Sequence, residues 1–313
     1  MKKYCIGIDL GGTFIKGGLV DINGNIIVFD KTPTEVEKGN LSICKNIASL
    51  IEQLIVKSGV PRSEIIGIGA GAPGMIDTKD GVLKCAENLL IENFPMAKTI
   101  KELTGFDVKM ANDANAATLG EVKFGAAKNK NNVIMLTLGT GVGGGIVCNG
   151  ELLEGNEGAG AELGHTVIAM GGELCSCGRR GCAEAYASAT ALIRETKKSM
   201  KAHKDSKMWE IGIDNVDGKT AFDYAETDKY AKQVVDNYIY ALATIIVNFA
   251  NTFRPDAIIL GGGVCAQGDS LIKPLTEIVN REIYGGKLGP QVPVLVAKLG
   301  NSAGVLGAAA LVI

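Results

Sequence analysis

Four short runs of aliphatic residues along the chain each end in glycines, a pattern typical of buried strands. They cover residues 5–13, 65–74, 133–141 and 257–263. The first run leads through a second apolar run to Asn23 and Gly24, and the third leads in the same way to Asn149 and Gly150. Because Asn-Gly favours the type I′ turn of a β-hairpin, we expect strands on both sides of each pair. One strand–glycine loop–strand unit therefore occurs twice, which predicts an internal duplication.

Two further segments have the apolar spacing of amphipathic helices. Residues 41–58 carry an apolar stripe, and residues 221–253 repeat apolar pairs at helical spacing before Pro255. Strands that alternate with helices predict an α/β architecture. A polar stretch at 128–132 precedes the second copy of the unit. We expect an N-terminal domain over residues 1–112 and a larger C-terminal domain over residues 113–301.

Composition narrows the possible partners. The 313 residues are 46% hydrophobic and 21% charged, the usual globular mix, and suffice for about two domains. A formal charge of −2 without a long basic run gives no support to a nucleic acid or an anionic membrane as partner. Asp9 comes too early for a secretory signal, and the apolar stretch 303–313 is shorter than the about 20 residues that span a bilayer. We therefore expect a cytoplasmic protein with reduced thiols.

Glycine is the anomaly in this composition. There are 42 glycines, where a usual content of about 7% would give roughly 22. In the segment 9–16, Gly11 and Gly12 would let backbone N–H groups approach phosphate oxygens, and Thr13 adds a hydroxyl donor. Asp9 could hold Mg²⁺ through water, and Lys16 closes the segment. By itself this segment is equally consistent with an ordinary hairpin turn.

The second copy of the unit repeats this glycine loop at Gly139, Thr140 and Gly141. No helix is expected to follow, so a Rossmann dinucleotide site is disfavoured. Two duplicated loops that face each other across a cleft would clasp a polyphosphate from both sides. Gly262 and Gly263 end another strand, where either an adenine ring or a plain strand-to-helix turn fits the sequence.

Asn112 and Asp113 follow an apolar segment and lead into small, helix-forming residues. One interpretation is that Asp113 only caps that helix, which is a frequent role of Asp. The other is that the two side chains bind a polyol, with an ionised Asp113 accepting a hydroxyl proton during phosphoryl transfer.

A cluster of cysteines supplies the most specific local signal. Cys175, Cys177 and Cys182 are three of the eight cysteines, and His165 is one of only two histidines. One His and three Cys match a closed tetrahedral Zn²⁺ site, which leaves no open position for catalysis. A disulfide or unrelated thiols are the alternatives, and the former is disfavoured in a reducing compartment. The other five cysteines are expected to be buried small hydrophobes, at positions 5, 44, 85, 148 and 265.

These motifs together resemble the ROK family of sugar kinases and repressors. The resemblance covers nearly the whole chain, and the segments that carry it are residues 9–13, 71–74, 112–113, 138–143, 162–184 and 261–263. It implies an actin-like, ribonuclease-H-like α/β fold with two duplicated domains around a cleft. In that fold the last helix, about residues 302–313, returns to the N-terminal domain.

The resemblance also implies roles for single residues. Asp113 would be the general base, and the sugar hydroxyls would be bound by Gly74, Asn112, Glu162, His165 and Glu184. Asp9 would serve Mg²⁺, and the two glycine loops would bind the phosphates of ATP. His165 would bind zinc with one ring nitrogen and face the sugar with the other, because a metal on one nitrogen fixes the ring's orientation.

The implied reaction is the transfer of the γ-phosphoryl group of ATP to the 6-hydroxyl of glucose. One departure from the family's glucose-specific members leaves other sugars open: Glu157 stands where glycine is expected, and Ala161 where glycine or another small residue is usual. An N-acetylmannosamine, N-acetylglucosamine or mannose kinase is therefore an alternative. A sugar-sensing regulator without catalysis is a weaker alternative. The family's repressors carry a DNA-binding domain ahead of the residue equivalent to Asp9, and we expect none here because Asp9 is too close to the start of the sequence. We expect a homodimer or a higher homo-oligomer.

Overall fold

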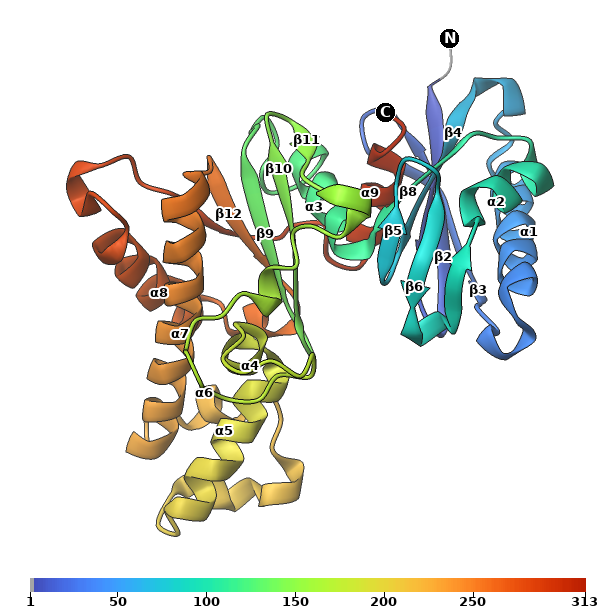
Figure 1. Ribbon diagram of the computed structural model, residues 1–313. Coiled ribbons are helices and arrows are strands. Elements are labelled where there is room, and N and C mark those ends of the chain that lie inside the picture. The colour runs from blue at the N-terminus through green and yellow to red at the C-terminus, as the bar shows by residue number, and fades with distance from the viewer. Residues whose placement is uncertain (1–2) are drawn as a thin grey trace. The chain divides into compact units, whose positions relative to one another are not determined.

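The computed structural model describes residues 3–313, and its contacts group the chain into two units (Figure 1). The first unit contains the residues up to Asn131, together with Gly145–Ala161 and Ala297–Ile313. The second unit contains Asn132–Gly144 and Glu162–Val296. The contacts place residues 113–131 in the first unit, whereas the expected division falls after residue 112. Each unit is described here by itself.

A five-stranded sheet forms the centre of the first unit. Its strands are β1 (Tyr4–Leu10), β2 (Phe14–Asp21), β3 (Ile26–Pro33), β4 (Ile65–Ala72) and β8 (Val108–Asn112). They lie in the order β3-β2-β1-β4-β8, with β1 antiparallel to β2 and parallel to β4. A small sheet accompanies it, made of β5 (Met75–Asp77), β6 (Val82–Ala86) and β7 (Ile91–Phe94).

A second five-stranded sheet repeats the same strand order. Its strands are β9 (Val133–Leu138), β10 (Val142–Cys148), β11 (Glu151–Leu152), β12 (Ala257–Gly261) and β13 (Val294–Val296), in the order β11-β10-β9-β12-β13. In each sheet the first strand of the copy lies between its own hairpin partner and the next parallel strand. The predicted duplication and the ribonuclease-H-like fold are confirmed.

Helices cover both faces of the first sheet, as adjacent glycines of β2 show. Successive residues of a strand point to opposite faces. A Cβ on Gly17 would meet Leu50 and Leu54 of α1 (Asn40–Ser58), whereas a Cβ on Gly18 would meet Val305 of α9 (Ala303–Ala310). The helix expected over 41–58 is confirmed as α1, and it lies against the sheet beside β2 and β3 in Figure 1.

Helix α9 approaches the first sheet at backbone distance. A Cβ on Gly7 of β1 would lie 2.0 Å from the Val305 carbonyl oxygen, and one on Gly69 of β4 would lie 1.7 Å from that of Ala308. Helix α3 (Asp113–Lys123) meets α9 in the same way, because a Cβ on Gly307 would lie 2.0 Å from the Ala116 carbonyl oxygen. Much of the glycine surplus therefore serves close packing, since any side chain at these positions would separate the elements.

A buried carboxylate holds the segment that leads into α9. Glu121 of α3 is fully buried, and its Oε1 accepts from the amides of Lys298 and Leu299, each at 2.8 Å. Its Oε2 accepts from the Ala126 amide at 2.7 Å. Three amide donors thus satisfy the buried oxygens of this carboxyl group and fix the segment that leads into α9.

The remaining helices differ from the sequence prediction at one place. They are α2 (Met96–Thr104) in the first unit, and α4 (Glu184–Ala187), α5 (Ala189–Ala202), α6 (Thr220–Tyr224), α7 (Lys229–Phe253) and α8 (Asp269–Glu282) in the second. The single helix expected over 221–253 is wrong, because the chain breaks between α6 and α7. Asp228 caps α7 by accepting from the amides of Tyr230 and Ala231, and a carboxylate used in this way starts a new helix.

The two Asn-Gly pairs form different turns. Asn149 and Gly150 both have positive φ, 54° and 83°, as a type I′ turn requires, and their strands pair directly at Cys148 and Glu151. At the first pair only Gly24 has a positive φ, 88°, so the type I′ prediction is wrong there. Within residues 3–313, no helix combines the length and apolarity needed to cross a membrane.

We predict that Gly69→Ala destabilises the protein by about 1–3 kcal/mol, because the new Cβ must displace the α9 backbone. The free energy of unfolding from urea titration measures the effect. Gly218→Ala is the matched control, since its Cβ would make an ordinary contact with Ala189 at 3.6 Å. Equal stability of the two variants would contradict the close packing of α9.

Candidate functional site

The first predicted phosphate segment is a hairpin between β1 and β2. Asp9 and Lys16 are cross-strand partners, and the Lys16 ammonium donates to Asp9 Oδ2 at 3.1 Å. The Gly11 amide donates to the Phe14 carbonyl at 3.1 Å, which closes the turn around Gly12 and Thr13. The hairpin interpretation of this segment is therefore correct for the backbone, and the carboxylate of Asp9 keeps Oδ1 for another partner.

Helix α9 lies directly against this carboxylate. A Cβ on Gly304 would stand 2.6 Å from Asp9 Cγ, so the glycine makes room for the acid. The same close packing that holds α9 on the sheet thus sets where Asp9 can point.

Asn112, rather than Asp113, caps helix α3. Its Oδ1 accepts from the amides of Ala114 and Asn115, and its amide nitrogen donates to the Gly74 carbonyl at 3.1 Å. Gly74 has φ 92°, and a Cβ there would lie 2.0 Å from the Cys85 carbonyl oxygen, so only glycine fits. The structure thus brings Gly74 and Asn112 together at the carboxyl ends of β4 and β8.

The carboxyl group of Asp113 has an unusual environment at the first turn of α3. Surrounding protein atoms remove much of its hydration, and the negative charge of Asp9 acts in the same direction. Together they raise the pKa of Asp113 above its ordinary value, against a hydrogen bond from the Ala114 amide that lowers it. The side chain still reaches solvent, so a substrate hydroxyl can approach it.

The loop ahead of Glu162 is strained at the two positions singled out from the sequence. Glu157 has φ 50° and Ala161 has φ 61°, in the left-handed region that favours glycine. Each costs about 1–2 kcal/mol relative to glycine. The loop is held in the first unit by Gly158, whose Cβ position lies 1.8 Å from the Ile76 carbonyl oxygen, and by a hydrogen bond from Thr78 to Glu154.

In the second unit, the four predicted metal ligands lie together. Their ligand atoms are all within 4.8 Å of one another, in the cluster His165, Cys175, Cys177 and Cys182. Cys177 Sγ is 3.7 Å from Cys182 Sγ, and Cys175 Sγ is 3.7 Å from His165 Nδ1. A tetrahedral zinc with Zn–S distances of about 2.3 Å requires edges of this length. The residues present therefore fit the ion.

Glu184, at the start of α4, joins this cluster to the second glycine loop. Its Oε1 accepts from the Ser176 hydroxyl at 2.7 Å, and its Oε2 accepts from the Val142 amide at 3.1 Å. Burial opposes ionisation, but the hydrogen bonds from Ser176 and Val142 outweigh it and hold the pKa of Glu184 below its ordinary value.

Helix α5 fixes the same glycine loop from its first turn. The Ala189 amide donates to the Gly139 carbonyl at 2.8 Å, and the Thr190 hydroxyl donates to the Thr140 carbonyl at 2.8 Å. The backbone of the predicted phosphate loop is therefore bound by residues of the segment 184–190.

The glycines after β12 form a turn. Gly262 has φ 92°, and its Cβ position lies 2.4 Å from the Leu138 carbonyl oxygen, which demands glycine. The chain then enters the short 3-10 helix Gly263–Gln267. The strand-to-helix turn is thus correct for the backbone, and a role in binding adenine stays a prediction.

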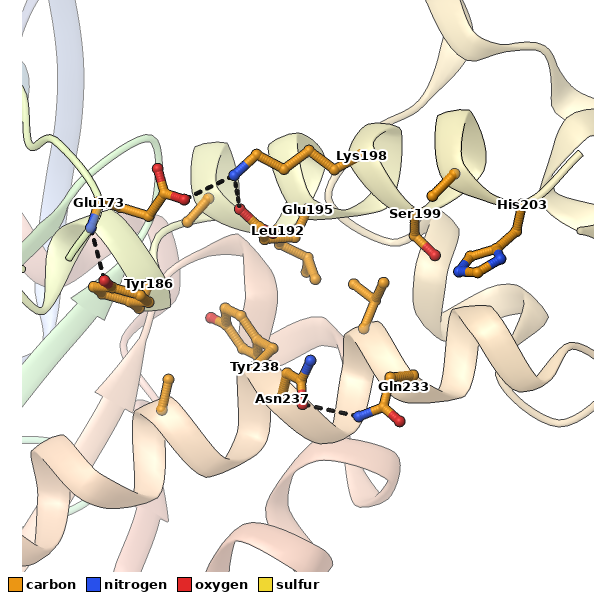
Figure 2. Close-up of a pocket in the computed structure, with 14 residues that line it drawn as sticks. Glu173, Tyr186, Leu192, Glu195, Lys198, Ser199, His203, Gln233, Asn237 and Tyr238 are labelled. Carbon is orange, nitrogen blue, oxygen red and sulfur yellow. Dashed lines mark hydrogen bonds and ion pairs between the residues drawn. The ribbon is translucent and has the colours of Figure 1, made fainter. Parts of the chain in front are cut away.

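A cavity of about 510 Å³ opens between α5 and α7 (Figure 2). Its lining includes none of the predicted site residues. Figure 2 shows Lys198 between Glu173 and Glu195, at 2.8 and 3.0 Å, so the charges at its rim are paired. On its wall, the Tyr186 hydroxyl accepts from the Glu173 amide at 2.8 Å, and the side chain of Tyr186 packs against Cys175 and Cys182.

Some residues that shape the site could not be identified from the sequence. Ser176 and Thr190 reach their partners across 8 and 50 residues, and a single hydroxyl carries no spacing pattern that would reveal this. The prediction for the remaining cysteines is wrong at two positions, because Cys85 and Cys148 are exposed. Cys5 and Cys44 are buried, which raises the pKa of each thiol to about 12.

Comparisons with known proteins agree with this architecture. A family model described as "ROK family" matches residues 5–313. A glucokinase of Halalkalibacterium halodurans is 38% identical over 311 residues, 97% of this chain and 93% of that protein. A glucokinase of Thermotoga maritima is 38% identical over 315 residues, 99% and 98% of the two chains. The crystal structure of a ROK family glucokinase from Streptomyces griseus, in complex with glucose and AMPPNP, superposes with a TM-score of 0.78 at 34% identity and covers 98% of each chain.

Proposed function

The chain belongs to the ROK family, and from this premise we propose that it is an ATP-dependent glucokinase that transfers the γ-phosphoryl group to the 6-hydroxyl of glucose. The observation that carries the proposal is the carboxyl group of Asp113 at the first turn of α3, whose pKa is raised by burial and by the negative charge of Asp9. This is what phosphoryl transfer to a hydroxyl needs: a base for the proton and a second acid for the metal of the nucleotide.

Asp113 acts as the general base. A base is most effective when its pKa approaches the working pH, so a raised pKa makes this carboxylate a better proton acceptor. As the hydroxyl oxygen attacks the γ-phosphorus, its proton passes to Asp113 and ADP leaves with the bridging oxygen. Asp9 would hold Mg²⁺ through Oδ1, since Lys16 occupies Oδ2.

The sugar ligands come in two sets. In the first unit, Asn112 and Gly74 lie at hydrogen-bond distance from each other next to Asp113. In the second unit, Glu162, His165 and Glu184 bind further hydroxyls. His165 directs Nδ1 toward Cys175, which leaves Nε2 for the sugar.

The phosphates of ATP would be bound at two glycine loops. Gly11, Gly12 and Thr13 offer one loop in the first unit, and Gly139, Thr140 and Gly141 offer the other in the second. Gly262 and Gly263 would face the adenine. Zn²⁺ would be held by the Cys₃His cluster and would orient His165, a structural role without a step in the reaction.

A coupled assay of ADP release tests this function. We predict turnover with ATP that is highest for glucose among glucose, mannose, fructose, N-acetylglucosamine and N-acetylmannosamine. A preference for an acetylated sugar or for mannose would contradict glucose as the substrate. It would indicate that the strained loop with Glu157 and Ala161 selects that other sugar. Sugar binding without ADP release would identify a sensor and contradict the kinase.

We predict that Asp113→Asn lowers kcat by roughly 10²–10⁴-fold, because the amide cannot accept the hydroxyl proton. The Asn side chain can still accept from the Ala114 amide, so the start of α3 should be preserved. Glucose affinity, measured by calorimetry, should change little. Wild-type turnover in this variant would exclude Asp113 as the base.

For zinc, we predict one ion per chain in the purified protein and its loss in Cys177→Ser, together with a raised KM for glucose. Metal analysis by mass spectrometry measures the first, and steady-state kinetics the second. Cys148→Ser is the control, because this cysteine is exposed and lies outside the cluster. A wild-type protein with far less than one zinc per chain would refute the metal site.

A further inference from the structure

The two oxygens of Glu184 are bound by two different parts of the second unit. Oε1 accepts from Ser176, which stands between two of the cysteines of the cluster, at 2.7 Å. Oε2 accepts from the Val142 amide at the end of the glycine loop, at 3.1 Å. One carboxylate thus connects the loop that carries the cysteines to the loop assigned to the nucleotide.

Gly141 owes its identity to the same carboxylate. Its φ is outside the left-handed region, so the backbone itself would tolerate a side chain. A Cβ at this position would lie 2.4 Å from Glu184 Oε2 and 3.2 Å from Cδ. A side chain at this position would therefore displace the Glu184 carboxylate, whether or not a phosphate also approaches the loop.

Ser176 is the donor that can keep Oε1 in place. The thiol of Cys175 is the other group near Oε1, at 3.5 Å. The Ser176 hydroxyl, at 2.7 Å, is the closer donor to this oxygen, and because Ser176 is exposed its removal leaves no cavity in the core.

We propose that Ser176 is a positioning residue for sugar binding, and that Glu184 couples the sugar to the nucleotide by holding the Val142 amide. The inference rests on the proposed role of Glu184 as a sugar ligand. A hydroxyl of the sugar that binds Glu184 stabilises the orientation in which Oε2 also holds the glycine loop. Binding of either substrate then favours the loop conformation that the other needs, because coupling between two sites is reciprocal.

The first test replaces the hydroxyl. Ser176→Ala should raise KM for glucose roughly tenfold while kcat changes less than about twofold, since one charge-assisted hydrogen bond is lost and the base is untouched. Ser176→Thr keeps the hydroxyl and should restore the KM. Zinc content should equal that of the wild type in both variants. Ser270→Ala is the matched control, an exposed serine of the same unit whose hydroxyl donates to the Gln267 carbonyl at 2.6 Å.

The second test uses the glycine loop. Gly141→Ala should raise KM for glucose more than KM for ATP, although the substitution lies in the loop assigned to the nucleotide, because its Cβ displaces the Glu184 carboxylate. The effects of Gly141→Ala and Ser176→Ala on KM for glucose should be clearly less than additive in the double variant, since both act through one carboxylate. Additive effects would overturn the shared route.

The third test measures the coupling itself. Calorimetry with AMPPNP, with and without saturating glucose, should show tighter nucleotide binding in the presence of the sugar for the wild type. The factor should fall toward one in Ser176→Ala. Equal AMPPNP affinity with and without glucose in the wild type would overturn the coupling.

A parallel Glu184→Gln variant separates the two levels of the argument. If it leaves KM for glucose unchanged, the role of Glu184 as a sugar ligand is wrong. If it raises this KM while Ser176→Ala has no effect, Glu184 binds sugar and the positioning role of Ser176 is wrong.

Discussion

The close approach of helix α9 to the first sheet is the constraint on which the geometry of the first unit depends. Glycines on both sides of the contact allow backbone to meet backbone, with Gly7 and Gly69 on the strands and Gly304 and Gly307 on the helix. The strands therefore cannot slide along the helix without a collision. Because Asp9 lies at the end of β1 against Gly304, the same contact that packs the core also places a carboxylate proposed to act on the nucleotide's metal ion.

Three carboxyl groups of this chain differ in their burial and in the hydrogen-bond donors that reach them. Glu121 is fully buried and accepts hydrogen bonds from three amides, so it holds the segment before α9 in place. Glu184 accepts hydrogen bonds from the Ser176 hydroxyl and the Val142 amide. At Asp113, burial and the negative charge of Asp9 raise the pKa, and the hydrogen bonds from the Ala114 amide and from its own amide do not offset them. The balance between burial and hydrogen-bond donors therefore shifts the pKa values of Glu184 and Asp113 in opposite directions.

Much of the fold was accessible from the sequence, and the gaps have physical causes. Aliphatic runs ending in glycine located β1, β4, β9 and β12, because burial on both faces leaves a clear trace in composition. The break before α7 was missed, since Asp228 interrupts an otherwise continuous apolar period through a local cap. The cysteine cluster was found because its ligands are close in sequence. Ser176 was missed, because a bond to Glu184 depends on how two turns meet.

Two separate physical causes favour glycine in this chain: a neighbouring atom that fills the place of a Cβ, and a backbone with positive φ. They lead to different expectations for substitution. At Gly74 and Gly262 both reasons apply, since φ is positive and backbone oxygen fills the place of a Cβ. At Gly141 only the contact with Glu184 applies, so a side chain there disturbs a functional group while the fold can persist. At Glu157 and Ala161 the reverse holds, because a left-handed backbone carries a side chain. At these two positions a change to glycine would relieve backbone strain, whereas at Gly74 and Gly262 a change from glycine would create it.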